Sequence, residues 1–325
     1  MKDEKRVGVC ILAALALLAG AAVLSLLVGR YPITWEGLWN DPYVAHVFVT
    51  LRLARTLMVL LAGIALGVAG SVYQTVFRNP LAAPDIIGVA SGASAGAAAG
   101  ILLFGGGSVL TALWAFGGGF AAVLAALALS ALSRERGIAN LVLSGIVVNA
   151  LAQAVLMLMK LTADPEKELA SIEFWIMGSF ADVTLDKTLG AAPWILLGLA
   201  GLVLLRRQIL LLGLEEEEAR TLGVPVGAVR TGVLLLATLV TGAVISVTGL
   251  ISFVGLLAPH TARLLTRSSR FSTTVLSGLC GGILLLLADV LARSVGNSEI
   301  PISIITSLLG APCLFWMMCR GRGAL

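Results

Sequence analysis

Long apolar runs separated by short polar turns repeat along almost the whole chain. The runs reach the length of about 20 residues that a helix needs to cross the hydrocarbon core of a bilayer. The turns between them carry much of the proline and charge. We therefore predict an all-α polytopic membrane protein with about ten transmembrane helices per subunit, at residues 7–28, 53–75, 86–104, 109–132, 138–160, 189–206, 229–247, 250–267, 273–293 and 302–319.

Two of these runs have a second interpretation. Residues 7–28 follow a charged start, as in a signal peptide, but the apolar core of a signal peptide is only about 7–15 residues long. We expect this run to be a retained first helix. Residues 250–267 follow the preceding run with almost no polar turn at Thr248. This segment is either a full span or a kinked or re-entrant piece.

Composition excludes a soluble protein. Hydrophobic residues make up 58% of the chain and charged residues only 12%, whereas soluble domains carry about 25% charged residues. The pattern continues to the end, so residues 1–325 are expected to form a single transmembrane domain in a lipid bilayer. The net charge of +4 then bears on membrane orientation, and no nucleic acid partner is expected.

The positions of lysine and arginine predict the orientation. With the N-terminus inside, fifteen of the 22 basic residues fall in inner connections and seven outside, which also favours an even number of spans and a cytoplasmic C-terminus. The inner residues are Lys2, Lys5, Arg6, Arg78, Arg134, Arg136, Arg206, Arg207, Arg220, Arg230, Arg263, Arg267, Arg270, Arg320 and Arg322; the outer ones are Arg30, Arg52, Arg55, Lys160, Lys167, Lys187 and Arg293.

Two connections are longer than simple turns. Residues 161–188, on the outer side, combine acidic residues with the amphipathic stretch 174–180, which is suited to the membrane interface. Residues 208–228, on the inner side, contain four consecutive glutamates, Glu215, Glu216, Glu217 and Glu218, followed by Ala219, Arg220, Leu222 and Gly223. This acidic stretch is either a solvated loop or a short surface helix that a cytoplasmic partner binds.

Small residues recur at helical spacing in two of the predicted spans. Gly63 and Gly67 share one helix face, and Gly92, Gly96 and Gly100 share another. Residues four apart stack on one face, and a face without side chains lets a neighbouring helix approach closely. These positions are therefore predicted to be helix-packing contacts.

The chain lacks the motifs of an enzyme. It contains no G-x-x-x-x-G-K-[ST] phosphate-binding loop and no recognisable catalytic or metal-ligand spacing. Asp289 is the main acidic residue within a predicted span, and Arg293 lies one turn away, as in a structural ion pair. An ion-driven transporter normally has more intramembrane charge. The energy source is therefore expected on another polypeptide, and no catalytic residue, metal or cofactor is assigned to this chain.

One polar face remains in the fifth run. Asn149, Gln153 and Met157 are four residues apart and share a helix face. The face either lines a pore or bonds to neighbouring helices through its two amides.

Several motifs in collinear order resemble the permease subunits of type II ABC importers, the family that takes up iron–siderophores, haem and vitamin B12. They are RLART at 52–56, RNPLAAPD at 78–85 followed by Gly88 and SGA at 91–93, FWIMGS at 174–179, ARTLG at 219–223, GLLAPHTAR at 255–263 and ADVLAR at 288–293. The resemblance covers essentially the whole chain. Ala54 and the pair Ala82–Ala83 depart from residues that are frequent in the family.

The resemblance implies a homodimer of ten-helix subunits in the cytoplasmic membrane of a bacterium or archaeon. Two cytoplasmic ATP-binding subunits, which carry ATP and Mg²⁺, bind to the coupling segment 215–223. An extracytoplasmic substrate-binding protein docks above, where Arg52 and Arg55, with Arg293 as a third member, map to outward-facing arginines that pair with its glutamates. The implied function is ATP-driven import of a siderophore, haem or cobalamin by alternating access, with 161–188 near the outer gate.

Other functions predict different behaviour. A secondary transporter would work on an ion gradient without an ATPase, whereas the importer needs ATP and its partners. A membrane enzyme would need clustered polar catalytic groups. The sequence does not distinguish iron chelate, haem, cobalamin or oxyanion as cargo.

Overall fold

A computed structural model describes residues 2–29, 35–106, 109–133, 137–268, 270–295 and 298–320. These ranges do not include four of the basic residues on which the predicted orientation rests: Arg30, Arg134, Arg136 and Arg322. The regular elements in the described ranges are helical: α1 (Lys2–Leu27), α2 (Trp35–Asn40), α3 (Pro42–Val47), η1 (Phe48–Leu53), α4 (Ala54–Val76), η2 (Pro84–Ile87), α5 (Val89–Phe104), α6 (Val109–Leu132), α7 (Ile138–Thr162), η3 (Pro165–Leu169), α8 (Ala170–Met177), α9 (Leu185–Leu204), α10 (Arg206–Leu212), α11 (Glu216–Thr221), α12 (Val226–Thr248), α13 (Val254–Thr266), α14 (Phe271–Ser294) and α15 (Ile302–Arg320).

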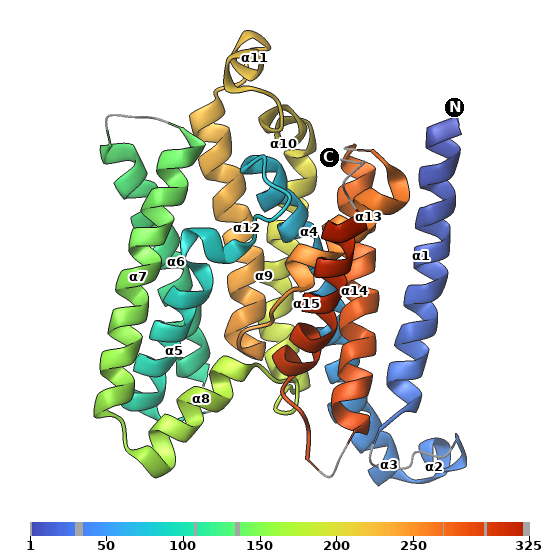
Figure 1. The fold of residues 1–325 in the computed structure, drawn as a ribbon. Coiled ribbons are helices and arrows are strands. Elements are labelled where there is room, and N and C mark those ends of the chain that lie inside the picture. The colour runs from blue at the N-terminus through green and yellow to red at the C-terminus, as the bar shows by residue number, and fades with distance from the viewer. Residues whose placement is uncertain are drawn as a thin grey trace.

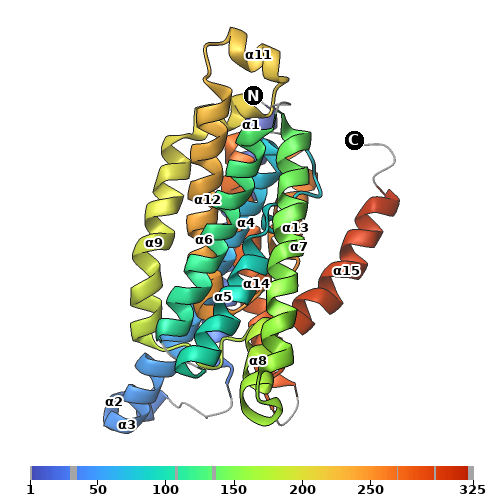
Figure 2. The ribbon, with the colours of Figure 1, turned by 90° about the vertical axis from the view of Figure 1, so that its left-hand side faces the viewer.

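The long helices run roughly alongside one another as a bundle (Figures 1 and 2). Among the described residues, seven helical runs are long and apolar enough to cross a membrane: Arg6–Leu27, Pro42–Val76, Val109–Leu132, Ile138–Thr162, Leu185–Leu204, Val226–Thr248 and Phe271–Ser294. Two shorter apolar helices, Val89–Phe104 and Ile302–Trp316, accompany them. The prediction of an all-α polytopic membrane protein is confirmed.

Glycines bring the central helices together. α4, α12 and α14 are more deeply buried than α1, α6, α7 and α9. A methyl group on Gly63 would lie 2.6 Å from the carbonyl oxygen of Gly281, and one on Gly67 would collide with the carbonyl of Ser277. α4 and α14 therefore meet at their backbones, which no larger side chain at these two positions would permit.

The glycines of α5 make the same kind of contact with α6. A methyl group on Gly92 would lie 2.5 Å from the Gly118 carbonyl oxygen and one on Gly100 2.8 Å from the Thr111 Cα. At Gly96 the added carbon would collide with the Trp114 carbonyl. The small-residue stripe in this helix is thus covered by one neighbouring helix along its length.

The run at 250–267 is not a full span. α12 ends at Thr248, residues 249–253 are non-helical, and α13 has only 13 residues, about 20 Å at 1.5 Å per residue. The segment between them is held inside the protein: Ser179 N–H donates to the Thr248 carbonyl at 2.8 Å, and the Ser303 hydroxyl donates to the Leu250 carbonyl at 2.7 Å. Protein partners thus satisfy part of the backbone that the helix break leaves unpaired.

The bundle has two distinct ends (Figures 1 and 2). At one end, α11 projects beyond the other helices, α1 begins and α15 ends; we call it the α11 end. At the other, α2, α3 and α8 cross the ends of the long helices; we call it the α8 end. α8 is only eight residues long, packs Ile172 inward and is tied to α7 by the Lys160–Glu173 ion pair at 2.9 Å.

Candidate functional site: an arginine pocket and an acidic loop

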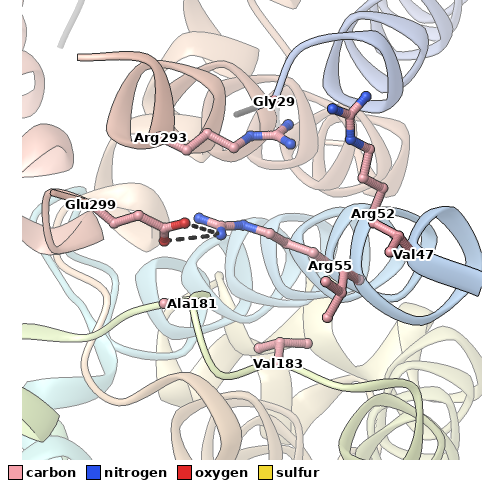
Figure 3. A pocket seen from close by; sticks show the side chains of 9 residues that line it. Gly29, Val47, Arg52, Arg55, Ala181, Val183, Arg293 and Glu299 are labelled. Atoms are coloured by element: carbon pink, nitrogen blue, oxygen red, sulfur yellow. Dashed lines mark hydrogen bonds and ion pairs between the residues drawn. The ribbon is translucent and has the colours of Figure 1, made fainter. Parts of the chain in front are cut away.

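Arg55 lies at the centre of a charged pocket at the α8 end. It stands in the first turn of α4. Its Nε and Nη2 donate to Asp289 Oδ1 of α14 at 3.0 and 2.9 Å, and its Nη1 donates to both carboxylate oxygens of Glu299 at 3.0 and 2.9 Å (Figure 3). One guanidinium therefore holds two carboxylates that come from different parts of the chain.

Arg293 and Arg52 hold the end of α1. Arg293 Nη2 donates to the carbonyl and hydroxyl oxygens of Ser25 at 2.7 and 2.8 Å. Arg52 Nη1 donates to the carbonyls of Leu26 and Leu27 at 3.0 and 3.1 Å. The last four carbonyls of a helix have no partner within the helix and carry its negative dipole end, so two cations are favourable there.

The resemblance maps Arg52 and Arg55, with Arg293 as a third member, to arginines that dock a binding protein on the outer side. Within the protomer, the side chains of Arg52 and Arg293 are only 7% and 6% exposed. Their guanidiniums turn to the α1 carbonyls because a buried cation needs acceptors. Arg55 is also bonded within the subunit, to the carboxylates of Asp289 and Glu299. Docking by these residues remains a prediction. Of the three arginines, Arg55 is bonded to a side chain, Glu299, that is partly exposed.

The two carboxylates of the pocket differ in exposure. The Asp289 side chain is completely buried, between Arg55 and Arg293, whose Nε lies 3.3 Å from Asp289 Oδ2 without the alignment of a hydrogen bond. The Glu299 side chain is 28% exposed. Arg52, Arg55, Arg293 and Glu299 line a cavity of about 220 Å³, together with Ala181 and Val183.

Sequence reasoning missed Glu299. It lies in the non-helical stretch between α14 and α15, outside every motif that carried the resemblance. It is nevertheless the only acidic residue after Asp289 in the sequence, which was the one available indication that it balances a buried arginine.

The acidic loop at the α11 end is fixed by its first two glutamates. Glu215 pairs with Arg78 at 2.8 Å, and Glu216 pairs with Arg220 at 2.8 Å and Arg230 at 3.0 Å. The hydrogen bond from Arg230 is the largest influence on Glu216; together with Arg220 it holds the pKa of that carboxyl below its usual value, against the opposing effect of burial. These pairs tie α11 to the turn after α4 and to α12.

The rest of the loop is directed outward. Glu217 and Glu218 are exposed, and neither side chain forms an ion pair with the described residues. Leu222 is exposed, Gly223 has a left-handed φ of 79° and Ala219 is buried beneath the helix. An apolar side chain and two unpaired carboxylates on a projecting helix give a surface that a protein partner can bind.

The face of α7 that carries Asn149, Gln153 and Met157 is not covered within the protomer. Gln153 and Met157 are exposed and Asn149 is half-buried. Among the described residues, neither amide forms a hydrogen bond with a neighbouring helix. Bonding to helices of the same subunit, one of the two alternatives, is therefore not seen in this part of the chain.

Comparisons with known proteins give one family. The FecCD transport family matches residues 16–320. The chain is 36% identical to the molybdate import system permease protein MolB of Haemophilus influenzae, over 91% of each chain, and 34% identical to the hemin transport system permease protein HmuU of Yersinia pestis, over 95% of this chain and 94% of that one.

A solved structure described as an inward-facing conformation of a metal-chelate type ABC transporter superposes with a TM-score of 0.86 at 34% identity, over 97% of this chain and 99% of that one. The family match at residues 16–320 spans both the arginine pocket and the acidic loop. The chain therefore belongs to the FecCD transport family, as a membrane permease subunit of a type II ABC importer.

Proposed function

We propose that this permease moves a metal chelate (a ferric siderophore or haem) or a cobalamin into the cell by alternating access. Two copies would work with two cytoplasmic ATP-binding subunits and one extracytoplasmic binding protein. The observation that carries the proposal is the contrast between the two ends of the bundle: a compact arginine pocket at one, and a projecting acidic helix at the other.

The charge distribution supports a cytoplasmic α11 end. Arg78, Arg206, Arg220 and Arg230 belong to segments at this end, and cytoplasmic connections are enriched in lysine and arginine. Both termini would then be cytoplasmic, and α8 would lie on the extracytoplasmic side, near the outer gate.

The projecting loop supports the ATPase contact. Residues 215–223 stand beyond the bundle (Figure 1), held from behind by Arg78 and Arg230. A helix that is rigidly attached to two transmembrane helices transmits a push to both of them, whereas a mobile loop would not.

The uncovered apolar surfaces support a second copy. Large side chains of α7 and α15, among them Leu151, Met157, Leu308 and Phe315, are more than half exposed in the protomer. Figure 1 shows α7 at the left-hand edge of the bundle and α15 nearer its middle, beside α13 and α14. A partner subunit that covers these side chains would enclose a path past Asn149 and Gln153.

Reconstitution tests the importer directly. Proteoliposomes holding the permease with its ATP-binding subunits should accumulate cargo only with ATP and the cargo-loaded binding protein, and ionophores that collapse proton and sodium gradients should not stop uptake. Uptake by the permease alone on an ion gradient would establish the secondary-transporter alternative. The buried Asp289, held by Arg55, supports the ATP-driven mechanism because it is not available as an ion carrier.

The cargo needs its own measurement. The relatives are named for molybdate and hemin at nearly the same identity, so similarity does not separate the two. Uptake should be compared for a ferric siderophore, haem, cobalamin and molybdate. Exclusive uptake of molybdate would refute the proposed cargo and leave the ATP-driven mechanism intact.

A further inference from the structure

The two carboxylates on Arg55 differ in how easily they can leave it. Asp289 is fully buried on α14 and has a second cation beside it in Arg293. Glu299 is partly exposed and receives its ion pair from Arg55 alone among the described residues. A carboxylate that arrives from solvent could therefore replace Glu299 at the guanidinium and could not replace Asp289.

The charge of the pocket favours such a replacement. Arg52, Arg55 and Arg293 carry three formal positive charges, and Asp289 and Glu299 carry two negative ones, so the formal charges leave an excess of one positive charge while Glu299 is in place. The excess rises to two when Glu299 swings out. An incoming carboxylate of a partner would restore the balance, and opposite charges on two partners also speed their encounter.

Glu299 is also connected to the outer gate region. The next residue, Ile300, donates its N–H to the Ala292 carbonyl at 3.1 Å, and the Ile302 N–H donates to the carbonyl of Gly178, directly after α8, at 3.0 Å. The Ser303 hydroxyl donates to the Leu250 carbonyl in the break between α12 and α13. The stretch 299–303 thus links Arg55 to α8, to α15 and to the non-helical segment 249–253.

We infer that Glu299 is an internal substitute for the binding protein, occupying Arg55 until a carboxylate of that protein takes its place. Exchange of the two carboxylates frees residues 299–303 and loosens the contacts of α15 and α8. Docking of the binding protein thereby changes the contacts that hold the outer gate region. The inference rests on the proposed docking of an extracytoplasmic binding protein at this pocket, and it adds a residue that competes with that partner.

The Glu299→Gln substitution tests the competition, because it keeps the shape of the side chain and removes its charge. The complete transporter, in lipid nanodiscs with its ATP-binding subunits, is titrated with the cargo-free binding protein of the same system. We expect the affinity for the binding protein to rise about fivefold or more. This factor corresponds to about 1 kcal/mol, the contribution of the one competing ion pair that the variant loses. Unchanged or weaker binding would overturn the inference.

A matched control separates this effect from a general loss of negative charge. Glu173 lies at the same end, pairs with Lys160 at 2.9 Å and makes no contact with Arg55. Glu173→Gln should leave the affinity within about twofold, since single exposed ion pairs contribute little. An equal rise in both variants would show a long-range charge effect and contradict competition at Arg55.

A second measurement needs no substitution. Hydrogen exchange at the amides of Ile300 and Ile302 in the wild-type transporter should accelerate when the binding protein is added, because both hydrogen bonds lie in the released stretch. Unchanged or slower exchange at both amides would overturn the inference.

Arg55→Gln distinguishes failure of the inference from failure of docking. If the binding protein docks on Arg55, this variant weakens binding whatever Glu299 does. Unchanged binding in Arg55→Gln would refute docking at this residue. Weaker binding in Arg55→Gln together with unchanged binding in Glu299→Gln would refute only the competition.

Discussion

The arginine pocket and the acidic loop hold similar numbers of charges and use them in opposite ways. In the pocket, Asp289, Arg52 and Arg293 are almost completely buried and bonded to their own chain. In the loop, Glu215 and Glu216 are paired, while Glu217 and Glu218 are exposed and form no ion pair with the part of the chain that the structure describes. The difference teaches that a charge in this protein is available to a partner where its own chain has left it exposed, and otherwise only after an internal partner has moved away.

The physical reason is the cost of desolvation. A buried charge without a partner costs several kcal/mol, so the buried members of the pocket must be satisfied within the subunit. An exposed glutamate keeps its water and needs no internal partner. Four variants, from the largest expected effect to the smallest, would sharpen or break this comparison.

Asp289→Asn should be the most damaging change. It leaves Arg55 with Glu299 as its one carboxylate and removes the carboxylate beside Arg293, and breaking a buried ion pair from one side costs about 3–5 kcal/mol. We expect a strongly lowered thermal unfolding midpoint of the purified permease in detergent. A midpoint equal to that of wild type would mean that the pocket is not a structural unit.

Arg293→Met should have the next largest effect. It keeps much of the side-chain volume and removes the donor to Ser25, and losing a charged hydrogen bond that satisfies a buried carbonyl costs about 1.5–3 kcal/mol. The loss should be local, so hydrogen exchange should accelerate most at the last turn of α1. Uniform acceleration across the bundle would contradict a role in holding α1.

The double substitution Glu217→Gln and Glu218→Gln should change function and not stability. We expect association with the ATP-binding subunits to weaken severalfold, more at low salt than at high salt, with the unfolding midpoint unchanged because surface substitutions usually stay within about 0.5 kcal/mol. Co-purification at two salt concentrations and thermal unfolding measure the two properties. A lowered unfolding midpoint with unchanged association would show that these two glutamates stabilise the fold and do not bind the ATP-binding subunits.

Arg230→Gln should have the smallest effect. Arg230 lowers the pKa of Glu216, so the pair stabilises the folded loop above the unfolded pKa of glutamate, about 4.3, and the contribution is lost as the pH falls through the lower folded pKa. At pH 7 the variant should lose about 0.3–1 kcal/mol. The stability difference from wild type should shrink on acidification below about pH 4; a constant difference would exclude Glu216 as the partner.

Much of the fold could be predicted because it depends on local pattern. The long apolar runs at 109–132 and 138–160 match α6 and α7 almost residue for residue. The acidic stretch 215–223 coincides with α11 and its flanks. Helix length and amphipathic or apolar pattern are properties of neighbouring residues, so one sequence suffices to place them.

The arginine pocket could be predicted only in part. The sequence indicates its three arginines because they lie on the outer side, against the general bias of basic residues to the inner side. It indicates Asp289 because a carboxylate within a predicted span is unusual. Their partners were not found: Ser25 is 268 positions from Arg293 and Glu299 is 244 positions from Arg55. Contacts over such separations leave no periodic trace along the chain.

The sequence by itself thus determined the class of the protein, the extent of most helices, the segregation of charge and the resemblance to type II importer permeases. Only the tertiary structure decided that 250–267 contains a short helix after a break, that Arg52 and Arg293 turn inward, and that Glu299 shares Arg55 with Asp289. Apolar periodicity is set by the bilayer around each segment, whereas a buried charge is oriented by whichever distant acceptor the packing brings beside it.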